Sequence, residues 1–100
     1  MEYAPRKISV PMVGRNEEPL VVRKHQLDTN KHVNNRQFVD MAMDYLPEDF
    51  EVRQVRAEYK RQAFLDDVLV PFVAEEEDRI VVVLADEKGG VYVVVEFLRK

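Results

Sequence analysis

The stretch LDTNKHVNNRQFVDMAMDYLP, residues 27–47, decides how this chain is interpreted. A polar run opens it, and apolar residues follow at helical spacing, at positions 38, 42 and 45 and at 39, 43 and 46. Apolar side chains cover most of the helix circumference, so we predict a helix that other elements surround. Pro47 ends this helix, because proline cannot continue it.

The segments around this helix carry strand patterns. Residues 20–27, LVVRKHQL, are predicted as a strand, and alternating apolar residues over 68–74 predict another. Residues 79–85 and 91–98 predict a hairpin joined by the turn DEKGG. Residues 51–64 fit both a helix by propensity and a strand by alternation. The prediction is an α+β domain with one helix against an antiparallel sheet.

The composition excludes several classes of function. The chain has 100 residues, 46% of them apolar, which suits one domain with a core. It has no cysteine, so disulfides, thiolate metal sites and cysteine nucleophiles are excluded and a cytoplasmic location is expected. A net charge of −4 argues against nucleic acid as a partner. The apolar runs are too short for a membrane span, and no signal peptide is evident.

The first nineteen residues differ from the rest. Pro5, Pro11 and Pro19 interrupt them, and proline does not suit a central strand. We expect residues 1–19 to be a linker-like segment and residues 20–100 to be a single domain. Met1 is then expected to be an internal methionine of a longer chain.

The polar run contains a possible catalytic group. Asp28, Asn30 and His32 lie at spacing two, so in an extended chain all three would project to one side. Asn34 and Asn35 follow where the helix begins, and asparagine is a good N-cap residue. A helix N-terminus with free N–H groups suits an anionic oxygen. Together these groups could activate water and hold an oxyanion, as acyl transfer requires.

Two other interpretations of the run stay open. Asp and Asn are common in turns, so the run could be a capped turn in which His32 only packs or is solvated. Asp28, His32 and His25 could also bind a metal, but two histidines seven residues apart match no established metal-site spacing, and we expect none.

The order of these residues resembles that of the acyl-acyl carrier protein (acyl-ACP) thioesterases of plants and bacteria. Those enzymes carry an Asp-x-Asn-x-His-Val-Asn-Asn run that leads into a helix ending in proline. A strand with a Glu-Tyr-basic-basic stretch follows, which here is Glu58, Tyr59, Lys60 and Arg61. The opening EYAPRKI is similar to the segment that enters the second half of those proteins.

The resemblance implies a hotdog fold, in which an antiparallel sheet curls around one central helix. It implies that residues 51–64 form a strand. It further implies two hotdogs in the full chain, of which this sequence matches the second. The catalytic residues of the family lie largely in that second half, whereas the first half supplies most of the acyl-chain pocket.

The resemblance also suggests roles for three residues. His32 would be the base or proton shuttle for the attacking water. Asn30 would position water or the thioester carbonyl, and Asp28 would orient or polarise its neighbours.

The sequence departs from the family at one pair. Where the plant enzymes have a Glu-Cys pair with assigned catalytic roles, this chain has Gln62 and Ala63. Alanine cannot be a nucleophile, and a glutamine amide can hydrogen-bond water but cannot take its proton. The mechanism consistent with these residues is direct attack by water assisted by His32, with helix amides near Asn34 and Asn35 holding the oxyanion.

The expected function is hydrolysis of acyl-ACP thioesters to free fatty acids, without a cofactor. The expected partners are an acyl carrier protein and an N-terminal hotdog in the full chain, and the isolated chain is expected to form a homodimer. Two alternatives remain: a hotdog module that binds an acyl group or partner without turnover, and a stand-alone homodimeric acyl-CoA thioesterase.

Overall fold

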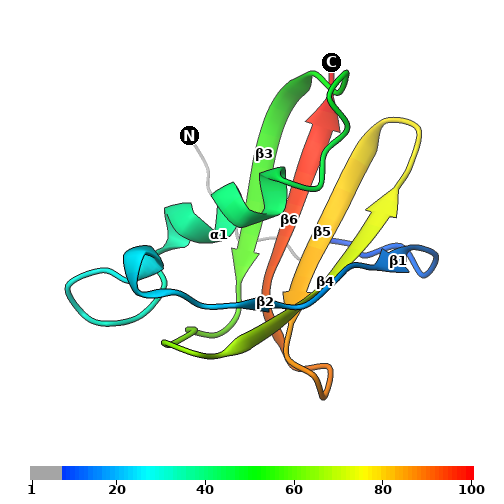
Figure 1. Ribbon diagram of the computed structural model, residues 1–100. Coiled ribbons are helices and arrows are strands. Elements are labelled where there is room, and N and C mark those ends of the chain that lie inside the picture. The colour runs from blue at the N-terminus through cyan, green and yellow to red at the C-terminus, as the bar shows by residue number, and fades with distance from the viewer. Residues whose placement is uncertain (1–7) are drawn as a thin grey trace.

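The computed structural model describes residues 8–100. Figure 1 shows one short helix crossing one side of a sheet. No helix in the described part is long and apolar enough to cross a membrane. In chain order the elements are β1 (Arg15–Asn16), β2 (Leu20–Val21), the 3-10 helix η1 (Lys24–Gln26), α1 (Asn35–Met43), β3 (Val52–Tyr59), β4 (Val68–Glu75), β5 (Arg79–Ala85) and β6 (Val91–Arg99).

The sheet is antiparallel throughout, and its strand order is β1-β4-β5-β6-β3, with β2 also paired to β4. The predicted hairpin is confirmed as β5 and β6, joined by a turn in which Gly89 has a φ of 94°. Strand β3 pairs only with β6 among the described elements, so it forms the long edge of the sheet. The implied strand in residues 51–64 is therefore confirmed.

Helix α1 begins where the sequence predicts and ends earlier. Asn34 is its N-cap, with a side chain that accepts hydrogen bonds from two backbone N–H groups. The helix ends at Met43, and single turns continue to Leu46 before Pro47. Met43 keeps 45% of its surface exposed. The expectation of a helix surrounded on most sides is therefore wrong, because the sheet covers one face only.

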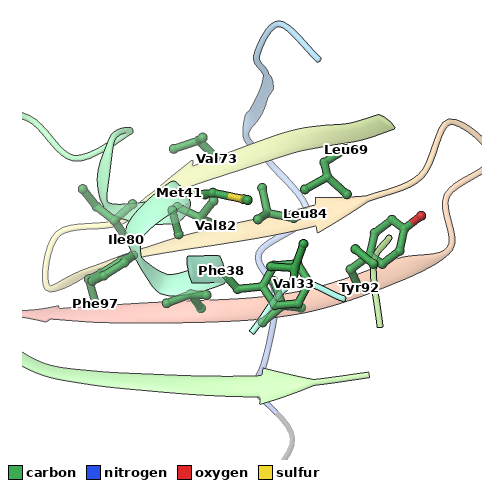
Figure 2. Close-up of a cluster of buried hydrophobic side chains, with 14 of the residues drawn as sticks. Val33, Phe38, Met41, Leu69, Val73, Ile80, Val82, Leu84, Tyr92 and Phe97 are labelled. Atoms are coloured by element: carbon green, nitrogen blue, oxygen red, sulfur yellow. The ribbon is translucent and has the colours of Figure 1, made fainter. Parts of the chain in front are cut away.

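That buried face of α1 packs on the helix-facing side of the sheet. Phe38 and Met41 meet alternate residues of β5, Ile80, Val82 and Leu84 (Figure 2). The intervening residues of β5 point to the other side of the sheet, where a second, smaller apolar cluster forms. Strand β5 is thus buried on both faces, which explains why its sequence is apolar almost throughout.

The second cluster is covered in part by the beginning of the chain. Residues 1–7 of the expected linker-like segment lie outside the described residues. Ile8 is buried in the second cluster, and its N–H donates to Glu58 Oε1 at 3.0 Å. A Cβ on Gly14 would lie 2.6 Å from the Phe72 ring and from the Val73 carbonyl oxygen, so only glycine fits this approach to β4.

The strand predicted over 20–27 is shorter than expected. Only Leu20 and Val21 pair with β4, and η1 follows. The Arg23 N–H donates to Gln26 Oε1 at 2.8 Å, and the Gln26 N–H donates to the Arg23 carbonyl at 3.0 Å. These local bonds stabilise a helical turn at the point where pairing with β4 stops.

Candidate active site

The polar run forms a closed turn. The Asp28 N–H donates to the His32 carbonyl at 3.0 Å, and the Lys31 N–H donates to the Asp28 carbonyl at 2.9 Å. Lys31 lies in the left-handed region with a φ of 67°. The Asp28 carboxylate caps the turn, because its Oδ1 accepts the Asn30 N–H at 2.8 Å. The extended conformation that would project alternate side chains to one side is therefore not present.

The turn leads into a pocket of about 500 Å³ between the start of α1 and the end of β3. Its lining contains most of the predicted site residues: Asp28, His32, Asn34, Asn35 and Gln62. Asn30 is exposed and does not line the pocket, because the capped turn carries it away. Val33, Phe38, Tyr59, Lys60 and Arg61 complete the lining.

His32 is the central titratable group of the pocket. Its side chain is 24% exposed, and its Nδ1 is buried without a hydrogen-bond partner among residues 8–100. The Asp28 Oδ2 atom lies 3.8 Å from this Nδ1, which is beyond hydrogen-bond length. A small shift would let the Asp28 carboxylate accept a hydrogen bond from Nδ1–H, and this would leave Nε2 as the basic nitrogen.

The start of α1 offers a free backbone donor beside His32. Asn34 Oδ1 accepts the N–H groups of Arg36 and Gln37 at 2.9 and 3.2 Å. The N–H group of Asn35 has no acceptor within the described part of the chain, whereas Asn34 directly follows Val33, whose antiparallel bridge with Leu27 turns the Asn34 N–H toward Gln26. The side-chain cap therefore occupies two helix donors and leaves the preceding one, the Asn35 N–H, for a ligand oxygen.

The opposite wall comes from the end of β3 and the residues after it. The Tyr59 ring tilts against Phe38, and its hydroxyl donates to the Asn35 carbonyl at 3.5 Å. Burial raises the pKa of Tyr59 above its usual value. Gln62 is exposed at the pocket, and Ala63 beside it is fully buried.

Arg61 ties this wall to the β5–β6 turn. Its guanidinium lies 4.0 Å from the Tyr92 ring centre and donates to Asp86 Oδ2 at 2.7 Å. The hydrogen bond from Arg61, together with the backbone N–H of Gly90, lowers the pKa of Asp86 to about 2. Arg61 is therefore held in place by neighbours outside the pocket.

Sequence reasoning did not identify two aromatic residues at the site. Tyr59 lines the pocket, and Phe64 contacts the His32 ring from the β3–β4 connection. The only available signal was their position on either side of the stretch KRQA. No group of three His, Cys, Asp or Glu side chains with metal-binding geometry occurs in residues 8–100.

Comparison with known proteins places this pocket in context. The model of the acyl-ACP thioesterase C-terminal domain family matches residues 11–91. No curated protein sequence matches the chain significantly.

Three solved structures share the fold. An acyl-ACP thioesterase from Bacteroides thetaiotaomicron VPI-5482 is 19% identical with a TM-score of 0.78, and the match covers 97% of this chain and 44% of that one. The 12:0-ACP thioesterase from Umbellularia californica is 20% identical with a TM-score of 0.78, and the match covers 98% of this chain and 39% of that one. The probable thioesterase YbaW from Escherichia coli is 20% identical with a TM-score of 0.65, and the match covers 80% of this chain and 77% of that one. The α+β hotdog layout is thereby confirmed, and the chain spans less than half the length of the two acyl-ACP thioesterases.

Proposed function

The chain belongs to the acyl-ACP thioesterase family as its C-terminal domain, and on this premise we propose that it carries a site for hydrolysis of acyl-ACP thioesters to free fatty acids. One observation supports this proposal above the others. The pocket brings together the His32 imidazole, the Asp28 carboxylate and the start of helix α1 at Asn34 and Asn35. These supply the base, the orienting group and the oxyanion donor that acyl transfer to water requires.

In the proposed reaction, His32 takes a proton from a water molecule while the water oxygen attacks the thioester carbonyl carbon. The carbonyl oxygen becomes an oxyanion and accepts a hydrogen bond from the N–H group of Asn35 at the start of α1. Collapse of the tetrahedral intermediate breaks the carbon–sulfur bond. The imidazolium returns its proton to the leaving thiolate, and the products are a fatty acid and the carrier thiol.

The remaining predicted residues have supporting roles in this proposal. Gln62 hydrogen-bonds the attacking water, and Asp28 orients the His32 ring. Asn30 can position water or the carbonyl only if its turn rearranges when substrate binds, since it does not line the pocket. Ala63 excludes a covalent acyl-enzyme at that position.

The proposal extends to the partners of the domain. The substrate would be an acyl group carried by ACP, and an N-terminal hotdog in the full chain would pair with this one and supply most of the acyl pocket. The limited coverage of the two acyl-ACP thioesterase structures supports this, at 44% and 39% of their lengths.

The test is hydrolysis of medium- and long-chain acyl-ACP by the 100-residue chain and by His32→Ala. We expect the substitution to lower kcat/KM roughly 10²–10⁴-fold, the usual contribution of a general base. His25→Ala is the matched control, because His25 is the other of the two histidines in the chain and lies exposed on η1. Full activity of His32→Ala would contradict the proposed site.

A second candidate function is a module that binds acyl-ACP without turning it over. The Gln62–Ala63 pair favours it, because neither side chain can act as base or nucleophile. The same experiment separates the two functions. Saturable binding of acyl-ACP, with hydrolysis no faster than in buffer for both the unmodified chain and His32→Ala, would support the binding module.

A further inference from the structure

Phe64 is an exposed aromatic residue beside the pocket. It follows the buried Ala63 in the β3–β4 connection and keeps 49% of its surface exposed. It belongs to neither buried apolar cluster. Burial in the core therefore does not account for a large apolar side chain at this position.

The backbone around Phe64 is held firmly. Its N–H donates to Asp67 Oδ2 at 2.8 Å, and its carbonyl accepts the Asp67 N–H at 3.0 Å. Asp66 between them has a φ of 71°, in the left-handed region. Tyr92 also donates its hydroxyl to Asp67 Oδ2, at 3.4 Å. This tight turn fixes the direction from which the Phe64 side chain leaves the backbone.

Phe64 meets the His32 ring edge to face. The ring centres are 6.3 Å apart and the planes cross at 88°, the T-shaped geometry that aromatic pairs prefer. The two residues also face each other in an antiparallel bridge, so backbone and side chains are both in register. Among residues 8–100 no hydrogen bond restrains the Nδ1 edge of His32, because the nearest acceptor, Asp28 Oδ2, lies 3.8 Å away.

We propose that Phe64 is a positioning residue that holds the His32 imidazole in its orientation by ring packing. This inference rests on the proposed role of His32 as the base. The packed Phe64 ring holds the imidazole while the hydrogen bond between Nδ1–H and Asp28 is not formed, so the ring stays where Asp28 can accept that bond after a small shift. Without it the imidazole can rotate, and the fraction of molecules with a correctly placed base falls.

The experiment compares Phe64→Ala, Phe64→Tyr and Leu65→Ala. Leu65 is the matched control, since it is the next residue, is 45% exposed and has no aromatic ring. With acyl-ACP as substrate, we expect Phe64→Ala to lower kcat about tenfold with little change in KM, because a displaced catalytic group slows the chemical step. Phe64→Tyr keeps the ring and should restore most of kcat, and Leu65→Ala should leave it unchanged.

A second measurement does not depend on turnover. Carbon–proton NMR of the two histidine rings reports the orientation of His32 directly, with His25 as an internal reference. Loss of the Phe64 ring current alone shifts the His32 signal, so line broadening is the readout, and we expect it for His32 in Phe64→Ala and not for His25. Leu65→Ala should broaden neither signal.

The outcomes distinguish this inference from the proposed function. A His32 signal that is not broadened in Phe64→Ala, or equal kcat losses in Phe64→Ala and Leu65→Ala, would overturn the positioning role. A broadened His32 signal in Phe64→Ala, in a protein whose hydrolysis survives His32→Ala, would support the positioning of the ring and overturn the proposed function of the site.

Discussion

At the scale of single residues, short acidic and amide side chains shape the loops around the pocket. Asp28, Asn34, Asp67 and Asp86 each accept at least one backbone N–H group within four residues. Such bonds compete with regular secondary structure and favour turns and caps. The polar run is thus a capped turn and also the lining of the pocket, because the bonds that cap the turn also place His32 beside α1.

The ion pair of Asp86 gives a prediction about pH. Its pKa is lowered from 3.8 to about 2, first by the hydrogen bond from Arg61 and then by the N–H of Gly90. A lowered pKa means that this group stabilises the fold above about pH 4, and that the contribution is lost as pH falls through about 2. Asp86→Asn should therefore lower Tm at neutral pH, with a difference from the unmodified chain that shrinks toward pH 2.

Thermal unfolding followed by circular dichroism between pH 7 and pH 2 measures this difference. Glu87→Gln is the control, since Glu87 is the exposed neighbour and forms no ion pair in the described residues. A Tm difference for Asp86→Asn that stays constant down to pH 2 would show that the carboxylate charge is not the cause.

At the scale of elements, the sequence predicts those segments whose structure depends on local pattern. The hairpin of β5 and β6 has continuous β-branched runs and a turn rich in Gly, and α1 has an N-cap and a helical apolar repeat. Strand β3 is ambiguous because it is an edge strand with exposed residues on both faces, so its alternation is weak. Its assignment as a strand required the family resemblance.

The same distinction applies to the site. Asp28, His32, Asn34 and Asn35 come from one continuous run, so their proximity follows from a turn and a cap. Tyr59 is held at the pocket by the β3–β6 pairing, and Phe64 reaches His32 through the bridge between these two residues; both pairings span long sequence separations. Spacing in the sequence does not reveal contacts of that kind, and it placed Asn30 in the site on the assumption of an extended chain.

A buried carboxylate connects three strands and gives a prediction about their packing. Glu96 of β6 is 4% exposed and binds Arg56 of β3 and Arg79 of β5, each at 2.7 Å. The Arg79 side chain is only 16% exposed, so removing Glu96 takes one of two carboxylates from a largely buried positive charge and, among the described residues, leaves only Glu76, at 2.6 Å. We expect Glu96→Ala to lower the free energy of unfolding by about 3 kcal/mol, as for other broken buried ion pairs.

Urea unfolding at neutral pH measures this loss. Arg56→Ala provides the comparison, because the Arg56 side chain is 39% exposed and its removal should cost less than about 1 kcal/mol. If Glu96→Ala and Arg56→Ala lower the free energy of unfolding equally, burial of Arg79 is not the reason that Glu96 stabilises the fold.

At the scale of the whole molecule, the sheet has one long edge that no other described strand covers. Strand β3 pairs with β6 on one side only, whereas the opposite edge is closed by the short strands β1 and β2. Exposed apolar side chains accompany this edge, with Val55 at 40% and Tyr59 at 43%. Tyr59 also lines the pocket, so an element that pairs with β3 would lie next to the proposed site.

An exposed strand edge with apolar side chains favours pairing with another chain. We therefore expect the isolated chain to form a homodimer through β3, in the place where the full protein would pair with an N-terminal hotdog. In a two-fold dimer, Val55→Lys places a positive charge on each side of the interface. The two charges repel each other, so the substitution should shift the chain to a monomer. Leu65→Lys is the control, because Leu65 has a similar exposure of 45% and lies outside β3.

Sedimentation velocity at tens of micromolar distinguishes these states. A dimer for the unmodified chain and Leu65→Lys, together with a monomer for Val55→Lys, would place the interface at β3. A monomer for the unmodified chain would contradict the prediction, because the exposed edge would then be stable in water. If the unmodified chain, Val55→Lys and Leu65→Lys all form dimers, the dimer interface lies on a surface other than β3. The second copy would then not lie beside Tyr59 and the pocket.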